Sequence, residues 1–173
     1  MDSLVHIGQP APDFSLADLD GNSHTLLQQQ GKIVVINFWS AECPWSLRAD
    51  EALAEWIPDL GDDVIIWPIA SNKNETMDQI RATANERGLS IVLRDEDLVV
   101  ADLYGAVTTP HFFVVDREGI LQYMGALDDV VFRQPVPTKY YLKDAVESLL
   151  ESSTPDPAET PGYGCTIIRY RDG

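Results

Sequence analysis

The sequence predicts an α/β fold in which a central mixed β-sheet is flanked by helices and followed by a C-terminal extension. An unbroken apolar run at residues 33–39 has the length of a buried strand, and residues 138–150 have the spacing of an amphipathic helix. Patterns of these two kinds alternate along the first 150 residues, which implies a sheet covered on both faces. The 173 residues suit one domain with a sizeable core.

Each expected element follows from a local pattern. The expected strands occupy residues 33–39, 63–70, 90–93, 111–116 and 120–125. The expected helices occupy residues 47–57, 74–87, 97–104 and 138–150. Pro68 is expected to interrupt the second strand, and Gly88 to end the second helix. The first and last helices have apolar faces, made of Leu47, Leu53, Trp56 and Ile57 and of Leu142, Ala145, Val146, Leu149 and Leu150.

The composition changes after residue 150. Residues 151–161 (ESSTPDPAETP) are rich in proline, serine, threonine and acidic residues, which is typical of an extended or mobile linker. We therefore expect one domain over residues 1–150, followed by a linker and tail over 151–173. This linker is long enough to carry Cys165 back over the domain.

Cys43 is the strongest candidate for a chemically active residue. It lies directly after the strand at 33–39 and directly before Pro44 and a helical pattern. Proline suits the first turn of a helix, where its missing N–H costs nothing. A cysteine at a helix N-terminus faces unpaired N–H groups, which lower the thiol pKa and favour the nucleophilic thiolate. The alternative is a buried, inert cysteine.

Motifs on both sides of Cys43 follow the pattern of one family. Residues 6–16 read HIGQPAPDFSL, Asp20-Gly21 follows, and residues 108–116 read TTPHFFVVD. They resemble the thioredoxin-like superfamily, specifically its redoxin branch of AhpC/TSA, peroxiredoxin-like and TlpA-like proteins. The resemblance implies a thioredoxin-like fold and a cis peptide bond at Thr109-Pro110, in a loop that lies against the reactive sulfur. Thr109 and Pro110 would then offer a backbone edge to a substrate, and Trp45 a further contact.

The motif departs from Cys-x-x-Cys, because Cys43-Pro44-Trp45-Ser46 contains one thiol. We expect Ser46 to support the thiolate by a hydrogen bond. Asn37 occupies the position of the buried aspartate of thioredoxins and cannot act as a general base. Glu42 is expected to oppose the thiolate. In the peroxiredoxin pattern Pro-x-x-x-Thr-x-x-Cys, Ser40 occupies the threonine position and keeps its hydroxyl, whereas Ile36 replaces the proline. The sequence therefore permits peroxidase activity without indicating it.

The second cysteine lies in the tail. Residues 161–170 (PGYGCTIIRY) resemble the Gly-Cys-x-Ile-Lys-Trp ending of a peroxiredoxin-like branch whose active-site segment is Cys-x-x-Cys-Pro-Tyr. In that comparison Cys43 matches the second cysteine of the segment, and Ser40 replaces the first. Cys165 then remains as the internal candidate to resolve an intermediate formed on Cys43. Alternatively, residues 166–170 add an edge strand and Cys165 only packs there.

Composition limits the partners and the location. Twelve basic and 28 acidic side chains give a net charge of −16, which argues against nucleic acid and anionic membranes as partners. The first residues lack a signal-peptide pattern, and the chain lacks a transmembrane-length apolar stretch. We therefore expect a cytoplasmic protein. No metal-ligand cluster or phosphate-binding glycine loop is evident, so we expect neither a metal nor another cofactor.

Two polar residues near the motifs have alternative interpretations. His111 follows Pro110, so it is either an acid or base of the site or an ordinary residue at a strand entry. Arg48 lies one helical turn after Cys43 and either stabilises the thiolate or is solvated. The insertion at residues 131–137 (VFRQPVP) has no predicted role.

Two functions follow. The preferred one is a thiol-disulfide oxidoreductase or peroxiredoxin-like thiol antioxidant that acts on a disulfide or a peroxide. In it Cys43 attacks, Cys165 resolves, and an external thiol reductant regenerates the protein. The alternative is a non-catalytic thioredoxin-like module that binds a partner through Trp45 and Pro110.

Overall fold

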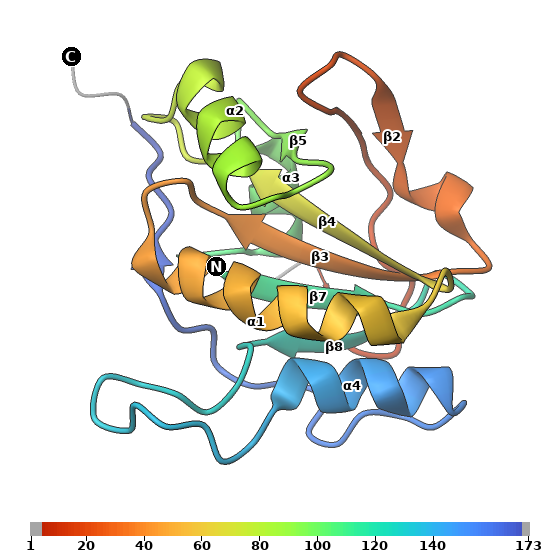
Figure 1. The fold of residues 1–173 in the computed structure, drawn as a ribbon. Coiled ribbons are helices and arrows are strands. Elements are labelled where there is room, and N and C mark those ends of the chain that lie inside the picture. The colour runs from red at the N-terminus through yellow and green to blue at the C-terminus, as the bar shows by residue number, and fades with distance from the viewer. Residues whose placement is uncertain (1–4, 171–173) are drawn as a thin grey trace.

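A mixed sheet of five strands lies at the centre of the computed structural model, which describes residues 5–170 (Figure 1). Its strands run in the order β5-β4-β3-β7-β8; β3, β4 and β5 are parallel, whereas β7 and β8 are antiparallel to their neighbours. The predicted α/β class and mixed sheet are confirmed. The strands are β1 (Ser15–Ala17), β2 (Ser23–Thr25), β3 (Ile33–Trp39), β4 (Val64–Ala70), β5 (Leu93–Arg94), β6 (Thr108–Thr109), β7 (His111–Val115), β8 (Leu121–Gly125) and β9 (Cys165–Thr166). The helices are α1 (Pro44–Leu60), α2 (Met77–Glu86), α3 (Val99–Tyr104) and α4 (Tyr141–Leu150), with a 3-10 helix at Leu26–Gln29.

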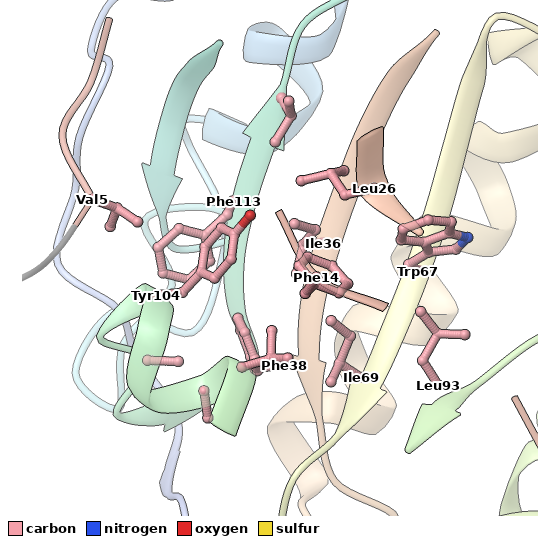
Figure 2. Packing of buried hydrophobic residues seen from close by; sticks show 14 of the residues in the cluster. Val5, Phe14, Leu26, Ile36, Phe38, Trp67, Ile69, Leu93, Tyr104 and Phe113 are labelled. Atoms are coloured by element: carbon pink, nitrogen blue, oxygen red, sulfur yellow. The ribbon is translucent and has the colours of Figure 1, made fainter. Parts of the chain in front are cut away.

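The core divides into layers on the two faces of the sheet. Because side chains alternate along a strand, β3 sends Val34, Ile36 and Phe38 to one face and Ile33 and Val35 to the other. The first set packs with α3 and aromatic residues such as Phe14, Trp67, Tyr104 and Phe113 (Figure 2). The second set packs with α1 and α4. Every residue of β3 is buried, and this rigid strand ends four residues before Cys43.

The first helix differs from its prediction in length and in its buried face. It begins at Pro44, as the proline rule indicates, but continues through Pro58 to Leu60. Of the predicted apolar face, Leu53 is buried, whereas Leu47 and Ile57 are 39% and 46% exposed. The buried face instead consists of Ser46, Ala49, Asp50 and Leu53. Its polar side chains point inward because Ser46 accepts a hydrogen bond from the Ser40 N–H and Asp50 accepts one from Arg87.

Other predicted boundaries shift by a few residues. Helix α2 begins after Thr76, where Thr76 and Gln79 form a capping box, rather than at residue 74. β4 continues through Pro68, which lies opposite Asn37 in β3. The short antiparallel β1-β2 pair had no predicted counterpart. The predicted stripe of α4 is confirmed, since Leu142, Ala145, Val146 and Leu149 are buried. None of the helices in the described residues has the length and apolar character needed to cross a membrane.

The segment after α4 follows the edge of the sheet. The Met124 N–H donates to Ala158 O, and the Thr160 N–H donates to Met124 O, both at 3.0 Å. A side chain on Gly125 would collide with the backbone of Thr160, so glycine is needed there. The last part of the predicted linker is thus hydrogen-bonded to β8 through Ala158 and Thr160. It leads the chain back to the start of α1 (Figure 1), as expected for a tail that carries Cys165 over the domain.

Candidate active site

Cys43 lies between the sheet and the first helix. Its backbone is extended, it is the N-cap residue of α1, and Pro44 follows at the first helical position. The strand, cysteine, proline and helix order expected from the sequence is therefore present. Cys43 is 3% exposed, so its sulfur lies beneath other parts of the chain.

The first of these parts is the loop that enters β7. The peptide bond between Thr109 and Pro110 is cis, as predicted. The carbonyl oxygen of Thr109 lies 3.2 Å from the Cys43 sulfur and accepts a hydrogen bond from the thiol. The predicted contact between this loop and the reactive sulfur is present.

The second part is the C-terminal tail. β9 pairs antiparallel with β6, and Cys165 lies opposite Thr109 in the register. Both cysteines are free thiols, and their sulfur atoms are 2.6 Å apart. In its described part the tail forms a strand only at Cys165–Thr166, not over the predicted residues 166–170, and it places Cys165 beside Cys43. Formation of a disulfide stays a prediction.

The tail is fixed on both sides of Cys165. Before it, the Tyr163 ring packs edge-on against Trp45 with centroids 4.9 Å apart, and the Tyr163 hydroxyl accepts from the Phe132 N–H at 2.7 Å. After it, Ile167 is buried in the core and its N–H donates to Val107 O at 3.0 Å. Trp45, predicted to contact a substrate, contacts the tail in this structure. The insertion at 131–137, which had no predicted role, helps to hold the tail.

The two thiols have opposite tendencies to ionise. Burial opposes ionisation of Cys43, but the Cys165 thiol, the Thr109 side chain and the backbone N–H groups of Ser46 and Cys165 favour its thiolate, so its pKa is lowered. Burial, together with the neighbouring Cys43 sulfur, raises the pKa of Cys165 to about 12. The site thus pairs a favoured thiolate with a thiol that stays protonated and can donate to it.

Alkylation should show this asymmetry. Because only the thiolate reacts, the rate at Cys43 should rise with pH and level off below the ordinary thiol value of 9.0, whereas the rate at Cys165 should still rise there. The measurement is iodoacetamide labelling over roughly pH 6 to 10 with peptide mass mapping. In Cys165→Ala, which removes the side-chain donor that favours the Cys43 thiolate, the inflection for Cys43 should move upward. An inflection for Cys43 at or above 9.0 in the wild type would contradict the assignment.

The two serines of the motif shape the loop instead of contacting the sulfur through their hydroxyls. The Ser46 hydroxyl accepts a hydrogen bond from the Ser40 N–H at 3.2 Å, which differs from its expected role as a donor to the thiolate. The Ser40 hydroxyl donates to Glu75 Oε2 at 2.6 Å and accepts from the Glu42 N–H at 3.2 Å. Both side chains therefore fix the backbone that precedes α1.

Neighbouring polar residues complete the surroundings of Cys43. The Glu42 carboxylate accepts a hydrogen bond from Gln79 at 3.2 Å. Asn37 is fully buried in β3, and its amide atoms have no hydrogen-bond partner among the described residues. Burial lowers the pKa of His111 to about 4, so its ring is neutral near pH 7. Arg48 is bound rather than solvated, since it forms two hydrogen bonds to the buried Asp128 at 3.2 and 2.5 Å.

Sequence reasoning missed Asn72 and Glu75, which follow β4. Their side chains are 4% and 3% exposed, and both contact the site. The predicted helix at 74–87 included Glu75. The capping pattern Thr76-x-x-Gln79 would have started that helix later and left both residues in the loop beside the carboxyl end of β3.

The approach of the tail to Thr109 depends on Gly164. A Cβ atom at this position would overlap the Thr109 carbonyl oxygen, so Gly164→Ala should push β9 away from β6 and separate the sulfurs. We expect formation of an internal disulfide to slow by about tenfold or more, because small displacements of reacting groups are costly. Rapid-quench mass spectrometry measures this rate. Thr166→Ala, in the same strand with an exposed side chain, is the control. An unchanged rate in Gly164→Ala would show that this contact does not position Cys165.

The fold is thioredoxin-like, and the two free thiols lie side by side in it. The model of the AhpC/TSA family matches residues 7–124, so the chain belongs to that family. Membership of this family, together with relatives that are thiol-disulfide oxidoreductases, shows that the chain is an oxidoreductase.

Curated relatives and solved structures resemble different extents of the chain. It is 30% identical over 120 residues to the thioredoxin-like protein YneN of Bacillus subtilis (strain 168), covering 68% of this chain and 70% of the relative. It is 32% identical over 119 residues to the thiol-disulfide oxidoreductase ResA of Geobacillus thermodenitrificans (strain NG80-2), covering 68% of this chain and 67% of that relative. A crystal structure of a hypothetical protein from Sinorhizobium meliloti 1021 is 31% identical, with a TM-score of 0.86 over 98% of this chain and 97% of that one. This last match includes the tail.

Proposed function

We propose that this protein exchanges thiols and disulfides, with Cys43 as the nucleophile and Cys165 as the resolving thiol. One observation carries the proposal: the sulfurs lie 2.6 Å apart, one on a helix N-cap and the other on a tail strand. The relative ResA is named a thiol-disulfide oxidoreductase, which supports the same chemistry.

In the first step the Cys43 thiolate attacks one sulfur of a substrate disulfide. The Cys43 sulfur forms a bond to that sulfur while the substrate S–S bond breaks, and the departing thiolate takes a proton. The product is a mixed disulfide between Cys43 and the substrate. The lowered pKa of Cys43 serves this step because the thiolate is the attacking form.

In the second step Cys165 gives up its proton and attacks the Cys43 sulfur. A Cys43–Cys165 disulfide forms, and the second substrate thiol leaves. The substrate has then gained two electrons and two protons, and the protein has lost them. An external thiol reductant returns the protein to its dithiol form. The raised pKa of Cys165 keeps this thiol protonated until a partner accepts the proton.

Substrate access requires movement of the tail. In the structure the tail covers Cys43 and contacts Trp45 and Thr109, the residues we expect to contact a substrate with Pro110. Separation of β9 from β6 would free these contacts. A bound substrate would then take the position of β9 beside Thr109.

The same two thiols permit a second reaction, reduction of a peroxide. Cys43 would be oxidised to a sulfenic acid with release of an alcohol or water, and Cys165 would displace water to form the same disulfide. The Ser40 hydroxyl, which occupies the threonine position of the peroxiredoxin pattern, is bonded to Glu75, so we favour the disulfide as substrate.

The test is intact mass with thiol counting after one equivalent of oxidised glutathione or hydrogen peroxide. We expect glutathione disulfide to yield protein that has lost two hydrogen atoms, carries no adduct and has no free thiol. Faster oxidation by peroxide would favour the peroxidase reaction instead. A stable glutathione adduct on Cys43 would exclude internal resolution, and two unreacted thiols would favour a non-catalytic binding module.

A further inference from the structure

The loop that follows β4 holds the backbone that precedes Cys43. Glu75, 3% exposed, accepts three hydrogen bonds through its side chain. They come from the Ser40 hydroxyl at 2.6 Å, the Ala41 N–H at 2.7 Å and the Asn72 amide at 2.8 Å. Since Ser40 and Ala41 connect β3 to the N-cap of α1, Glu75 fixes the path that places the Cys43 sulfur.

The same loop holds the tail. Asn72 donates to Glu75 through its amide nitrogen, and its amide oxygen accepts from the Ile168 N–H at 2.8 Å. The Lys73 N–H donates to Ile168 O, also at 2.8 Å. Ile168 lies three residues after Cys165, so these two hydrogen bonds fix the tail directly beyond the second thiol.

Arg94 makes the loop rigid. Its guanidinium donates to the carbonyl oxygens of Ala70 at 2.8 Å, Asn72 at 3.3 Å and Glu75 at 3.1 Å. The loop therefore has a fixed shape from the end of β4 to Glu75. A continuous path of hydrogen bonds runs from Ser40 and Ala41 through Glu75 and Asn72 to Ile168.

We propose that Asn72 and Glu75 are positioning residues that hold the Cys43 loop and the Cys165 tail in register for internal disulfide formation. This inference rests on the proposed function. Neither side chain takes part in the exchange itself. By fixing both segments in the reduced protein, the pair raises the effective concentration of one thiol beside the other and so favours the oxidised form.

Substitutions that exchange donor and acceptor separate positioning from folding. Asn72→Asp keeps the oxygen that accepts from the Ile168 N–H, but it replaces the amide donor with a second oxygen that faces the Glu75 carboxylate. Glu75→Gln, with its amide nitrogen in the position of Oε2, sets a donor against Asn72. The double variant Asn72→Asp/Glu75→Gln restores one donor and one acceptor in the reverse order. Asn85→Asp, with an exposed side chain on α2, is the matched control.

The measured quantity is the equilibrium constant for reduced protein plus oxidised glutathione giving oxidised protein plus two glutathione thiols, from thiol counts by mass. We expect each single variant to lower it about tenfold, as for a buried hydrogen bond left unmade beside a charged group. The double variant should recover part of the loss, because it restores the bond between positions 72 and 75 but not the Oε2 acceptor of the Ser40 hydroxyl. Asn85→Asp should match the wild type. The pH at which Cys43 alkylation levels off and the melting temperature are recorded for every variant.

The outcomes separate this inference from the proposed function. If the single variants keep the wild-type constant, or if their melting temperatures fall without a change in it, the pair does not position the thiols. A double variant no better than the singles would overturn the donor and acceptor assignment. If the wild type itself forms no internal disulfide, the proposed function fails, whatever the variants do.

Discussion

Replacing Cys43 with serine should lower the rate of disulfide reduction by about three orders of magnitude, to the uncatalysed level. A serine hydroxyl is not ionised near neutral pH and cannot form the mixed disulfide, whereas the pKa of Cys43 is lowered by its surroundings. The measurement is kcat/KM for a disulfide substrate with excess thiol reductant. Circular dichroism should show that the variant is folded, because Cys43→Ser changes one buried atom.

Cys165→Ser is the matched variant, because it removes the neighbouring sulfur and leaves the nucleophile. It should react once with a disulfide and stop at a mixed disulfide on Cys43, visible as an adduct by intact mass. Cys43→Ser should leave Cys165 slow to react, since burial, the largest cause of its raised pKa, is kept in this variant. Full activity in Cys43→Ser, or an adduct on Cys165 in the wild type, would reverse the two roles.

The position of Cys43 could be predicted because its causes are local. The apolar run at 33–39 forms a fully buried strand, and Pro44 starts the helix as its missing N–H requires. Contact of the Thr109-Pro110 loop with the sulfur was implied by family resemblance, and the structure places the Thr109 carbonyl 3.2 Å away. Without the resemblance, the Thr-Thr-Pro sequence before an apolar run would have indicated only the start of a strand, not a contact with the sulfur.

What the sequence did not reveal depends on contacts between distant segments. Apolar periodicity assigned Leu47 and Ile57 to the buried face of α1, yet both are exposed. The buried face includes Asp50, whose partners Trp39 and Arg87 are 11 and 37 residues away in the chain. Likewise, residues 158–160 are held by backbone bonds to β8, which composition does not report.

This buried charge should be important for stability. Asp50 accepts hydrogen bonds from the Trp39 indole at 2.7 Å and from Arg87 at 3.0 Å, and Arg87 also lies over the Trp39 ring and donates to Ala41 O at 2.9 Å. Burial raises the pKa of Asp50 although Trp39 and Arg87 favour its ionised form. Forming this pair in the interior is thus costly, and breaking it leaves a nearly buried guanidinium and a buried indole N–H without their acceptor.

Asp50→Ala should therefore lower the free energy of unfolding by about 3 kcal/mol and the melting temperature by roughly 10 °C. Urea denaturation and thermal circular dichroism measure the two effects. Asp50→Asn, which keeps an oxygen for Trp39 or Arg87 but loses the charge, should fall between Asp50→Ala and the wild type. Asp59→Ala, an exposed aspartate on the same helix, is the control and should change stability by less than about 0.5 kcal/mol. Equal losses in Asp50→Ala and Asp59→Ala would show that the buried pair contributes nothing to stability.

Because Arg87 also binds Ala41, two residues before Cys43, Asp50→Ala should in addition slow disulfide exchange in the protein that remains folded.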